Sequence, residues 1–217
     1  MTAGDVIARI RENLGTTWRD AGYRDTFKFG RPTTQVRGIA TTAFVTLDVI
    51  ERAAAAGLNM IIPHEVTYWN DRDDQSIVEG DPVYRRKIDL MREHDIVVFR
   101  IHDHMHVQRP DFTYVGSART IGLDPSTETA PGSHRFVVPE TTLGELAAHV
   151  QRHSGARAIR VVGDPAARVS RIHLGVGYAT PPVRADDVDV VISGEQQEGD
   201  GAFDSPAYVI DSAAVGV

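Results

Sequence analysis

Two short stretches of the chain carry most of the residues that could bind a metal ion. His64 and Glu65 directly follow the apolar run of residues 58–62 and Pro63. The second stretch, residues 102–106, reads HDHMH and directly follows the apolar run that ends at residue 101. Imidazole and carboxylate groups suit Zn, Fe or Mn better than Ca or Mg. Two strands that each end in such residues indicate one metal site at one edge of a sheet.

The spacing of the histidines in residues 102–106 leaves two geometries open. In an extended segment His102, His104 and His106 share one face, whereas in a helix or turn only His102 and His106 do. A rim of solvated histidines without any metal is the alternative. The other histidines have no ligand-type neighbours, and we expect structural roles for them. They are His94, His134, His149, His153 and His173.

The elements that must position these residues form a βαβ unit. Residues 58–62 and 96–101 read as strands, and an amphipathic helix that ends near His94 separates them. The two strands of such a unit are normally parallel neighbours with a right-handed crossover. Their carboxyl ends therefore meet at one sheet edge, where open α/β sheets bind their ligands.

The rest of the chain continues the alternation of helices and strands. Residues 16–34 read as a loop with a turn at GRPT, and Thr142 begins a helix with the spacing of a capping box. Strands are predicted at residues 158–162, 169–176 and 189–193. Ser205, Pro206 and Gly216 predict a last helix.

This order predicts an α/β fold with a mixed, largely parallel sheet and βαβ units flanked by helices. We expect residues 1–217 to form a single α/β domain, with a possible sub-domain boundary near residues 126–134, where Pro and Gly gather.

The composition excludes several classes of protein. The formal net charge of −7 argues against general nucleic-acid binding, which depends on Lys and Arg. The absence of cysteine excludes disulfides and thiolate metal sites and fits a cytoplasmic location. No stretch approaches the length of a membrane span, and the N-terminus lacks the apolar core of a signal peptide. We therefore expect a cytoplasmic protein without nucleic-acid or membrane partners.

A group of acidic residues follows the predicted strand 189–193. Glu195, Glu198 and Asp200 stand directly after it, and the strand could end at the same sheet edge as His64. These carboxylates could be outer ligands, a general base or a solvated acidic loop.

The motifs resemble those of a dinuclear-metal family, the Ngg-interacting-factor-three-like proteins, also known as GTP cyclohydrolase I type 2 homologues. In that family an apolar strand precedes His-His, similar to residues 60–65 (MIIPHE), and a second strand precedes His-Thr-Asn-x-Asp, similar to residues 102–106. A later Gly-Asp turn looks like Gly194-Glu195. This chain has Glu65 where the family has its second His, and His106 where it has a bridging Asp.

The resemblance implies a metal-dependent hydrolase with one or two divalent ions (Zn, Fe or Mn) and a nucleotide- or pterin-like small-molecule substrate. The implied metal ligands are His64, Glu65, His102 and His106, with Glu195 as the catalytic base. It also implies a homo-oligomer, since family members form hexamers. A non-catalytic metal-binding or regulatory scaffold is the alternative.

The resemblance also extends to residues that this sequence lacks. The family supplies a further His and Glu, four residues apart on a helix that follows one more strand. No such pair precedes Val217. We therefore expect the chain to be a C-terminally truncated form.

Overall fold

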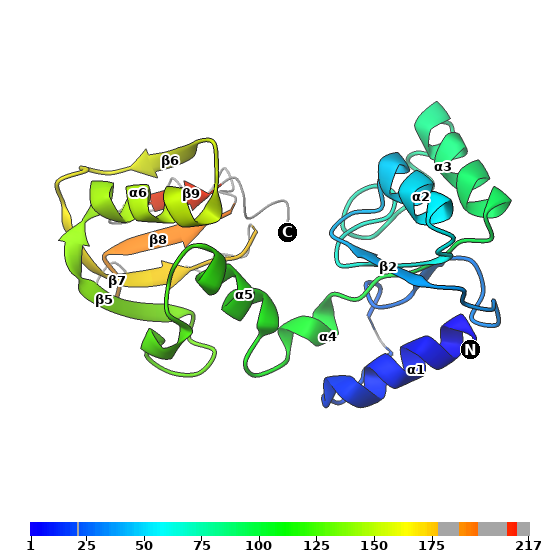
Figure 1. Cartoon of the computed structure of the whole chain (residues 1–217), viewed down its shortest axis with the longest axis horizontal. Helices are drawn as coiled ribbons and strands as arrows, with labels where there is room; N and C mark the ends of the chain where they lie inside the picture. The colour runs from blue at the N-terminus through cyan, green and yellow to red at the C-terminus, as the bar shows by residue number, and fades with distance from the viewer. Residues whose placement is uncertain (21, 178–186, 195–207, 212–217) are drawn as a thin grey trace. The chain divides into compact units, whose positions relative to one another are not determined.

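The computed structural model of the chain describes residues 1–20, 22–177 and 187–194, and the backbone of residues 208–211. The chain separates into two compact units, Met1–Gln108 and Arg109–Val217. Figure 1 shows the elements of each unit. The boundary near residues 126–134 and the single-domain organisation stay predictions from the sequence.

The first unit is built on a four-stranded sheet with the strand order β1-β4-β3-β2. Strands β2, β3 and β4 run parallel, and β1 pairs antiparallel with β4. The expected βαβ unit is confirmed, because helix α3 connects β3 to its parallel neighbour β4. The bounds of these strands and of α3 are β1 (Phe27–Phe29), β2 (Ile39–Thr42), β3 (Met60–Pro63), β4 (Val97–Phe99) and α3 (Pro82–Glu93).

Helices cover both faces of this sheet, which explains why its central strands are apolar throughout. Ile61 and Val98 point into a core shared with α2 (Leu47–Ala55) and α3. Their neighbours along the strands, including Met60 and Val97, point to the opposite face and pack with α1 (Ala3–Leu14). The central strands are therefore fixed from both sides. This rigid frame carries the short helix α4 (Asp103–His106) just beyond the end of β4.

The second unit holds a five-stranded mixed sheet with the order β5-β7-β8-β9-β6. Strands β7, β8 and β9 run parallel, while β5 and β6 pair antiparallel with β7 and β9. The bounds of the strands are β5 (Arg135–Thr142), β6 (Ile159–Val162), β7 (Arg168–Leu174), β8 (Val190–Ser193) and β9 (Tyr208–Asp211). The mixed α/β fold predicted from the sequence is confirmed.

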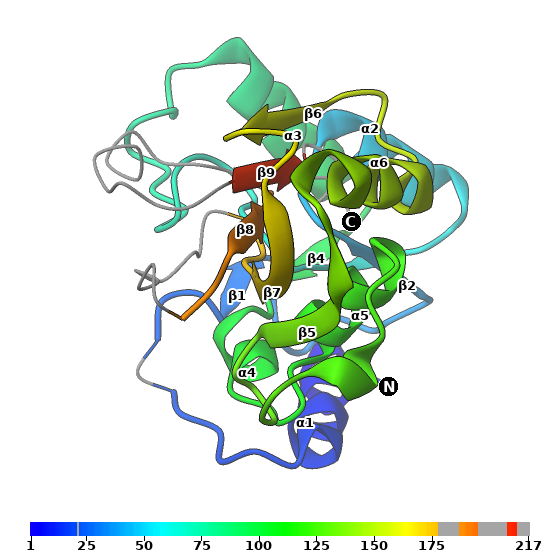
Figure 2. The same ribbon diagram turned by 90° about the vertical axis from the view of Figure 1, so that its left-hand side faces the viewer.

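Helix α6 (Leu143–Ser154) packs across this sheet, as Figure 2 shows. Its buried side chains Leu146 and Val150 join Ile172 in the core of the unit. The expected capping box is present, since Thr142 and Glu145 bond reciprocally across the first turn. Helix α5 (Phe112–Thr120) and the 3₁₀ turn Pro125–Thr127 precede this sheet in the chain.

The prediction of a helix over residues 205–216 is wrong for residues 208–211. Tyr208–Asp211 forms strand β9, which pairs with β8 on one side and β6 on the other. The Ser-Pro pair before it suggested a helix start, but the run YVI consists of strand-forming residues. Pairing with two strands overrides the local helix signal.

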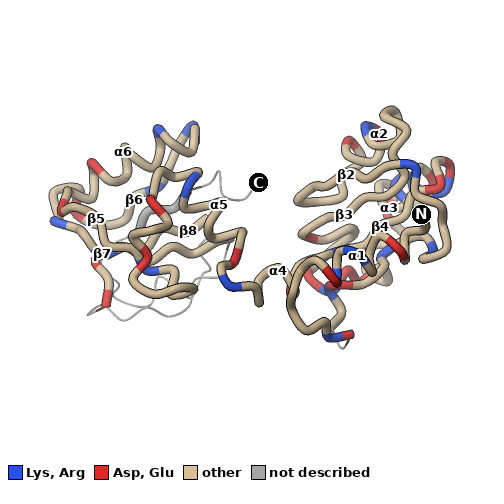
Figure 3. Tube along the Cα trace, turned by 60° about the horizontal axis from the view of Figure 1, so that its bottom comes forward, with Lys and Arg blue, Asp and Glu red and all other residues tan. Residues whose placement is uncertain are grey.

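Positively and negatively charged residues are scattered over each unit, as Figure 3 shows. Such interspersion is typical of the surface of a globular protein. None of the helices in the described part of the chain has the length and apolar character that crossing a bilayer requires.

Candidate metal centre

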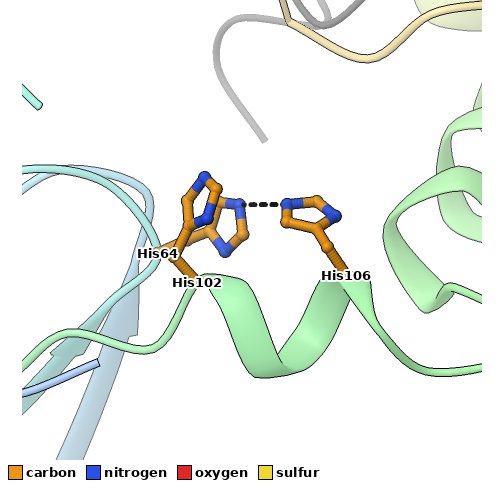
Figure 4. A group of neighbouring side chains, drawn as sticks. All are labelled: His64, His102 and His106. Atoms are coloured by element: carbon orange, nitrogen blue, oxygen red, sulfur yellow. Dashed lines mark hydrogen bonds between the residues drawn. The ribbon is translucent and has the colours of Figure 1, made fainter. Parts of the chain in front are cut away.

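Three histidines from the two predicted stretches come together in the first unit. One ring nitrogen from each of His64, His102 and His106 lies within 4.8 Å of the others. Figure 4 shows the three rings facing one another, with His102 and His106 at the two ends of α4. The Nε2 atoms of His64 and His106 are 3.2 Å apart. The structure thus takes the helical alternative, in which His102 and His106 share a face.

Backbone pairing beyond the strands brings the two stretches together. The amide of Ile101 donates to the carbonyl of Pro63 at 3.0 Å, and the amide of His64 donates to the carbonyl of Thr42 at 3.0 Å. The ladder of the parallel sheet therefore continues past β3 and β4. It fixes the residues just after both strands at one edge of the sheet.

Two of the imidazoles have their second ring nitrogen occupied. His64 Nδ1 lies 3.2 Å from the carbonyl oxygen of Ile101, and His102 Nδ1 lies 3.0 Å from a carboxylate oxygen of Asp103. Both partners are acceptors, so Nδ1 carries the hydrogen in each ring. The Nε2 atoms keep their lone pairs. Contacts of this kind orient metal-binding histidines in proteins.

The protonation of these rings favours metal binding. Burial, together with the neighbouring imidazole of His106, lowers the pKa of His64 below its ordinary value. Burial and the rings of His64 and His106 likewise lower the pKa of His102. Both rings are consequently neutral at neutral pH, which is the form that coordinates a metal.

Glu65 lies beside this group of three rather than inside it. Its Oε1 atom is 3.9 Å from His64 Nε2 and 3.8 Å from His102 Nε2. Its Oε2 atom accepts from the guanidinium of Arg100 at 3.2 Å. One carboxylate oxygen thus faces the imidazoles while the other is held by a cation. The role of Glu65 as a metal ligand stays a prediction.

Two arginines connect the segments around the centre through hydrogen bonds and ion pairs. Arg100 is fully buried and donates to the carbonyl oxygens of His64 at 3.0 Å and Asp71 at 2.8 Å. Arg24 pairs with Asp71 and also bonds Asp103 at 3.1 Å. The hydrogen bonds from Arg24 hold the pKa of Asp71 well below its ordinary value. The guanidinium groups of Arg100 and Arg24 therefore connect the segments that carry the histidines to one another.

The remaining histidine of the second stretch turns away from the centre. His104 is buried against the ring of Trp18, and its Nδ1 contacts Asp25. Sequence reasoning missed Asp25, Arg24 and Arg100. Asp25 and Arg24 stand in a segment that the sequence predicted as a loop, and Arg100 stands in the apolar run predicted as the strand 96–101. A charged residue in a run that is otherwise buried was the one available signal.

The other predicted residues fall elsewhere. Glu195 lies outside the described residues, as do Glu198 and Asp200, so their proposed roles stay predictions. None of the five histidines expected to be structural belongs to the group of three within the described part of the chain.

The chain is similar in fold to several proteins of known structure. No curated protein matches the chain. A Bacillus cereus protein related to NIF3 superposes with a TM-score of 0.77 at 13% identity, covering 99% of this chain and 89% of that one. The Staphylococcus aureus hypothetical protein SA1388 gives 0.75 at 17% identity, covering 97% and 85%. Reduced HcgD from Methanocaldococcus jannaschii gives 0.64 at 14% identity, covering 99% and 90%.

These structures share the fold of the chain, and the sequence match identifies its family. The model of the family Duf34/NIF3 (NGG1p interacting factor 3) matches residues 1–205. The match takes in both ligand stretches and most of the second unit. The chain belongs to the Duf34/NIF3 family.

Proposed function

We propose that the chain is a metal-dependent hydrolase with one divalent ion, Zn, Fe or Mn, held by His64, His102 and His106. The observation that carries the proposal is the convergence of three imidazole nitrogens within 4.8 Å. Three protein ligands leave one position of a tetrahedral site for water or substrate, which is the arrangement of catalytic zinc sites. When bound, a divalent ion supplies Lewis acidity that activates water and polarises the scissile group of a substrate.

The residues present fit such an ion. The Nε2 atoms of His64 and His102 carry lone pairs, because an acceptor holds the hydrogen on Nδ1 in each ring. Both rings stay neutral at neutral pH, so no proton has to be displaced before binding. Arg100 holds one oxygen of Glu65 and leaves Oε1 facing the imidazoles. In this proposal Glu65 acts as a fourth ligand or accepts a proton from water.

A second candidate function follows from the same position of Glu65. If its Oε1 atom coordinates the ion, the centre holds four protein ligands, which is the closed arrangement of structural zinc sites. The chain would then be a metal-binding scaffold without catalysis. Substrate turnover separates the two functions, whereas metal binding alone does not.

The test is hydrolysis by the chain loaded in turn with Zn, Fe(II) and Mn. Substrates are a nitrophenyl phosphodiester, nucleoside triphosphates and a reduced pterin, since the family resemblance implies a nucleotide- or pterin-like compound. We expect turnover that His64→Ala abolishes while the circular dichroism spectrum is unchanged. His153→Ala, a change on the exposed end of α6, serves as the control and should keep full activity. Stoichiometric metal without turnover of any substrate would contradict the hydrolase and favour the scaffold.

A further inference from the structure

One buried carboxylate holds the helix that carries two of the three histidines. Asp25 is 7% exposed and accepts hydrogen bonds from three consecutive backbone amides. Its Oδ1 atom accepts from His102 at 2.6 Å and from Asp103 at 3.1 Å, and its Oδ2 atom accepts from His104 at 2.9 Å. These amides stand at the start of α4, where no preceding helical carbonyl group is available to accept their hydrogen bonds.

Helix α4 has little stability of its own. It contains four residues, far fewer than an isolated helix needs in water. Its N-cap residue, His102, makes no side-chain cap hydrogen bond and has φ −136° and ψ −69°. The carboxylate of Asp25 therefore replaces the missing local cap, from a position 77 residues earlier in the chain.

The imidazole of His104 fixes the rotation of the same helix. Its Nε2 atom accepts from the amide of Arg19 at 2.9 Å, so Nδ1 carries the hydrogen and donates to Asp25. Its ring stacks on Trp18, with centroids 3.7 Å apart and planes at 7°. Both nitrogens are thus occupied by protein groups. Since successive helical residues turn by about 100°, fixing His104 on one face directs His102 and His106 to the other.

We propose that Asp25 is a positioning residue of the metal centre, which holds α4 in the one orientation that points His102 and His106 at His64. The inference rests on the metal centre proposed above. Asp25 acts through the helix and through His104, and it contributes no ligand atom. Outer groups that orient metal ligands typically change the affinity for the ion by about 10- to 100-fold when they are removed.

The test compares the affinity for Co(II) and the visible absorption of the Co(II) form in wild type and in Asp25→Asn. Asparagine has the same size as aspartate. Its NH₂ group is a donor, however, so it cannot accept the hydrogen bonds that one of the two carboxylate oxygens accepts in the wild type. We expect the Co(II) affinity to fall by about 10- to 100-fold. The absorption bands should also change in intensity or position, because the ligand geometry is less fixed.

Two control variants separate positioning from general destabilisation. Asp48→Asn removes an exposed carboxylate on α2, where it pairs with Arg52. Ile50→Val weakens the core between α2 and the sheet, a cluster that holds no residue of α4. Both should keep the wild-type Co(II) affinity and spectrum. Loss of affinity in Ile50→Val equal to that in Asp25→Asn would overturn the positioning role.

A further variant decides the question if Asp25→Asn does not fold. His104→Phe keeps the stacking on Trp18 but removes the bonds to Asp25 and Arg19. We expect a loss of Co(II) affinity of roughly tenfold, at the lower end of the range for outer groups. Wild-type affinity in either folded variant overturns the inference and leaves the metal centre standing. A wild-type chain that binds no Co(II), Zn or Mn overturns the centre and the inference together.

Discussion

The histidines around the metal centre and the histidine of strand β7 differ in what surrounds them. In the first unit, His64, His102 and His104 each have a hydrogen-bond acceptor at Nδ1. In the second unit, His173 on β7 is 3% exposed, and neither ring nitrogen has a partner among the described residues. Imidazoles are thus oriented by polar contacts around the metal centre, whereas that of His173 is buried without them.

The difference distinguishes histidines that are oriented for metal binding from a histidine that is only packed in a core. An oriented, neutral imidazole such as that of His64 or His102 presents a defined lone pair that can coordinate an ion. A buried imidazole without partners costs stability, because its polar atoms lose their hydrogen bonds to water. The first unit should accordingly respond to loss of its polar partners, whereas the second should respond to pH.

The largest effect on stability is expected from removing the charge of Arg100, which is buried in the first unit. Arg100→Met leaves the carboxylates of Glu65 and Asp71 and two carbonyl groups without their buried donor. We expect the free energy of unfolding, measured with urea, to fall by about 3–5 kcal/mol. The exposed Arg86→Met on α3 is the control and should change it by less than about 0.5 kcal/mol. Equal stability of the two variants would show that the network does not hold the unit together.

The next effect concerns pH and the second unit. Burial, with smaller contributions from His134 and Arg135, lowers the pKa of His173 to about 4. The unfolded chain binds a proton near its ordinary pKa of about 6.5, so stability falls as the pH drops from about 6.5 to 4. The expected loss is about 3 kcal/mol.

His173→Leu tests this dependence directly. The variant should flatten the loss between pH 6.5 and 4 in urea unfolding curves, and it should be at least as stable as wild type at pH 7, because it removes an unpaired polar group. His153→Leu, on the exposed end of α6, is the matched control and should keep the wild-type pH dependence. An unchanged pH dependence in His173→Leu would contradict the contrast between the units.

The smallest effects come from a feature that both units share. Helices α1 and α6 each begin with a capping box, formed by Thr2 with Asp5 and by Thr142 with Glu145. Thr2→Ala and Thr142→Ala should each lower the free energy of unfolding by about 1 kcal/mol. Neither should alter metal affinity, because neither cap touches the three histidines. A changed affinity in Thr2→Ala would weaken the assignment of positioning to α4 and Asp25.

The frame of the candidate site was predictable from the sequence because it follows from local patterns. The apolar runs and the crossover rule placed His64 and His102 at one sheet edge. The choice between an extended and a helical 102–106 was not predictable, since it depends on Asp25 and Trp18, which are distant in sequence and stand in a segment without periodicity. Strand β9 was mistaken for helix for a similar reason, because its partners β8 and β6 are not local.

The most direct measurement of the central claim is the number of metal ions that each chain binds. Titration of the metal-free chain with Zn in a calorimeter, together with elemental analysis, should give one ion per chain. His106→Ala should weaken binding by more than about 100-fold, because it removes a ligand rather than an outer group. His153→Ala should bind as wild type does. The absence of stoichiometric metal in the wild-type chain, or unchanged binding in His106→Ala, would contradict the account.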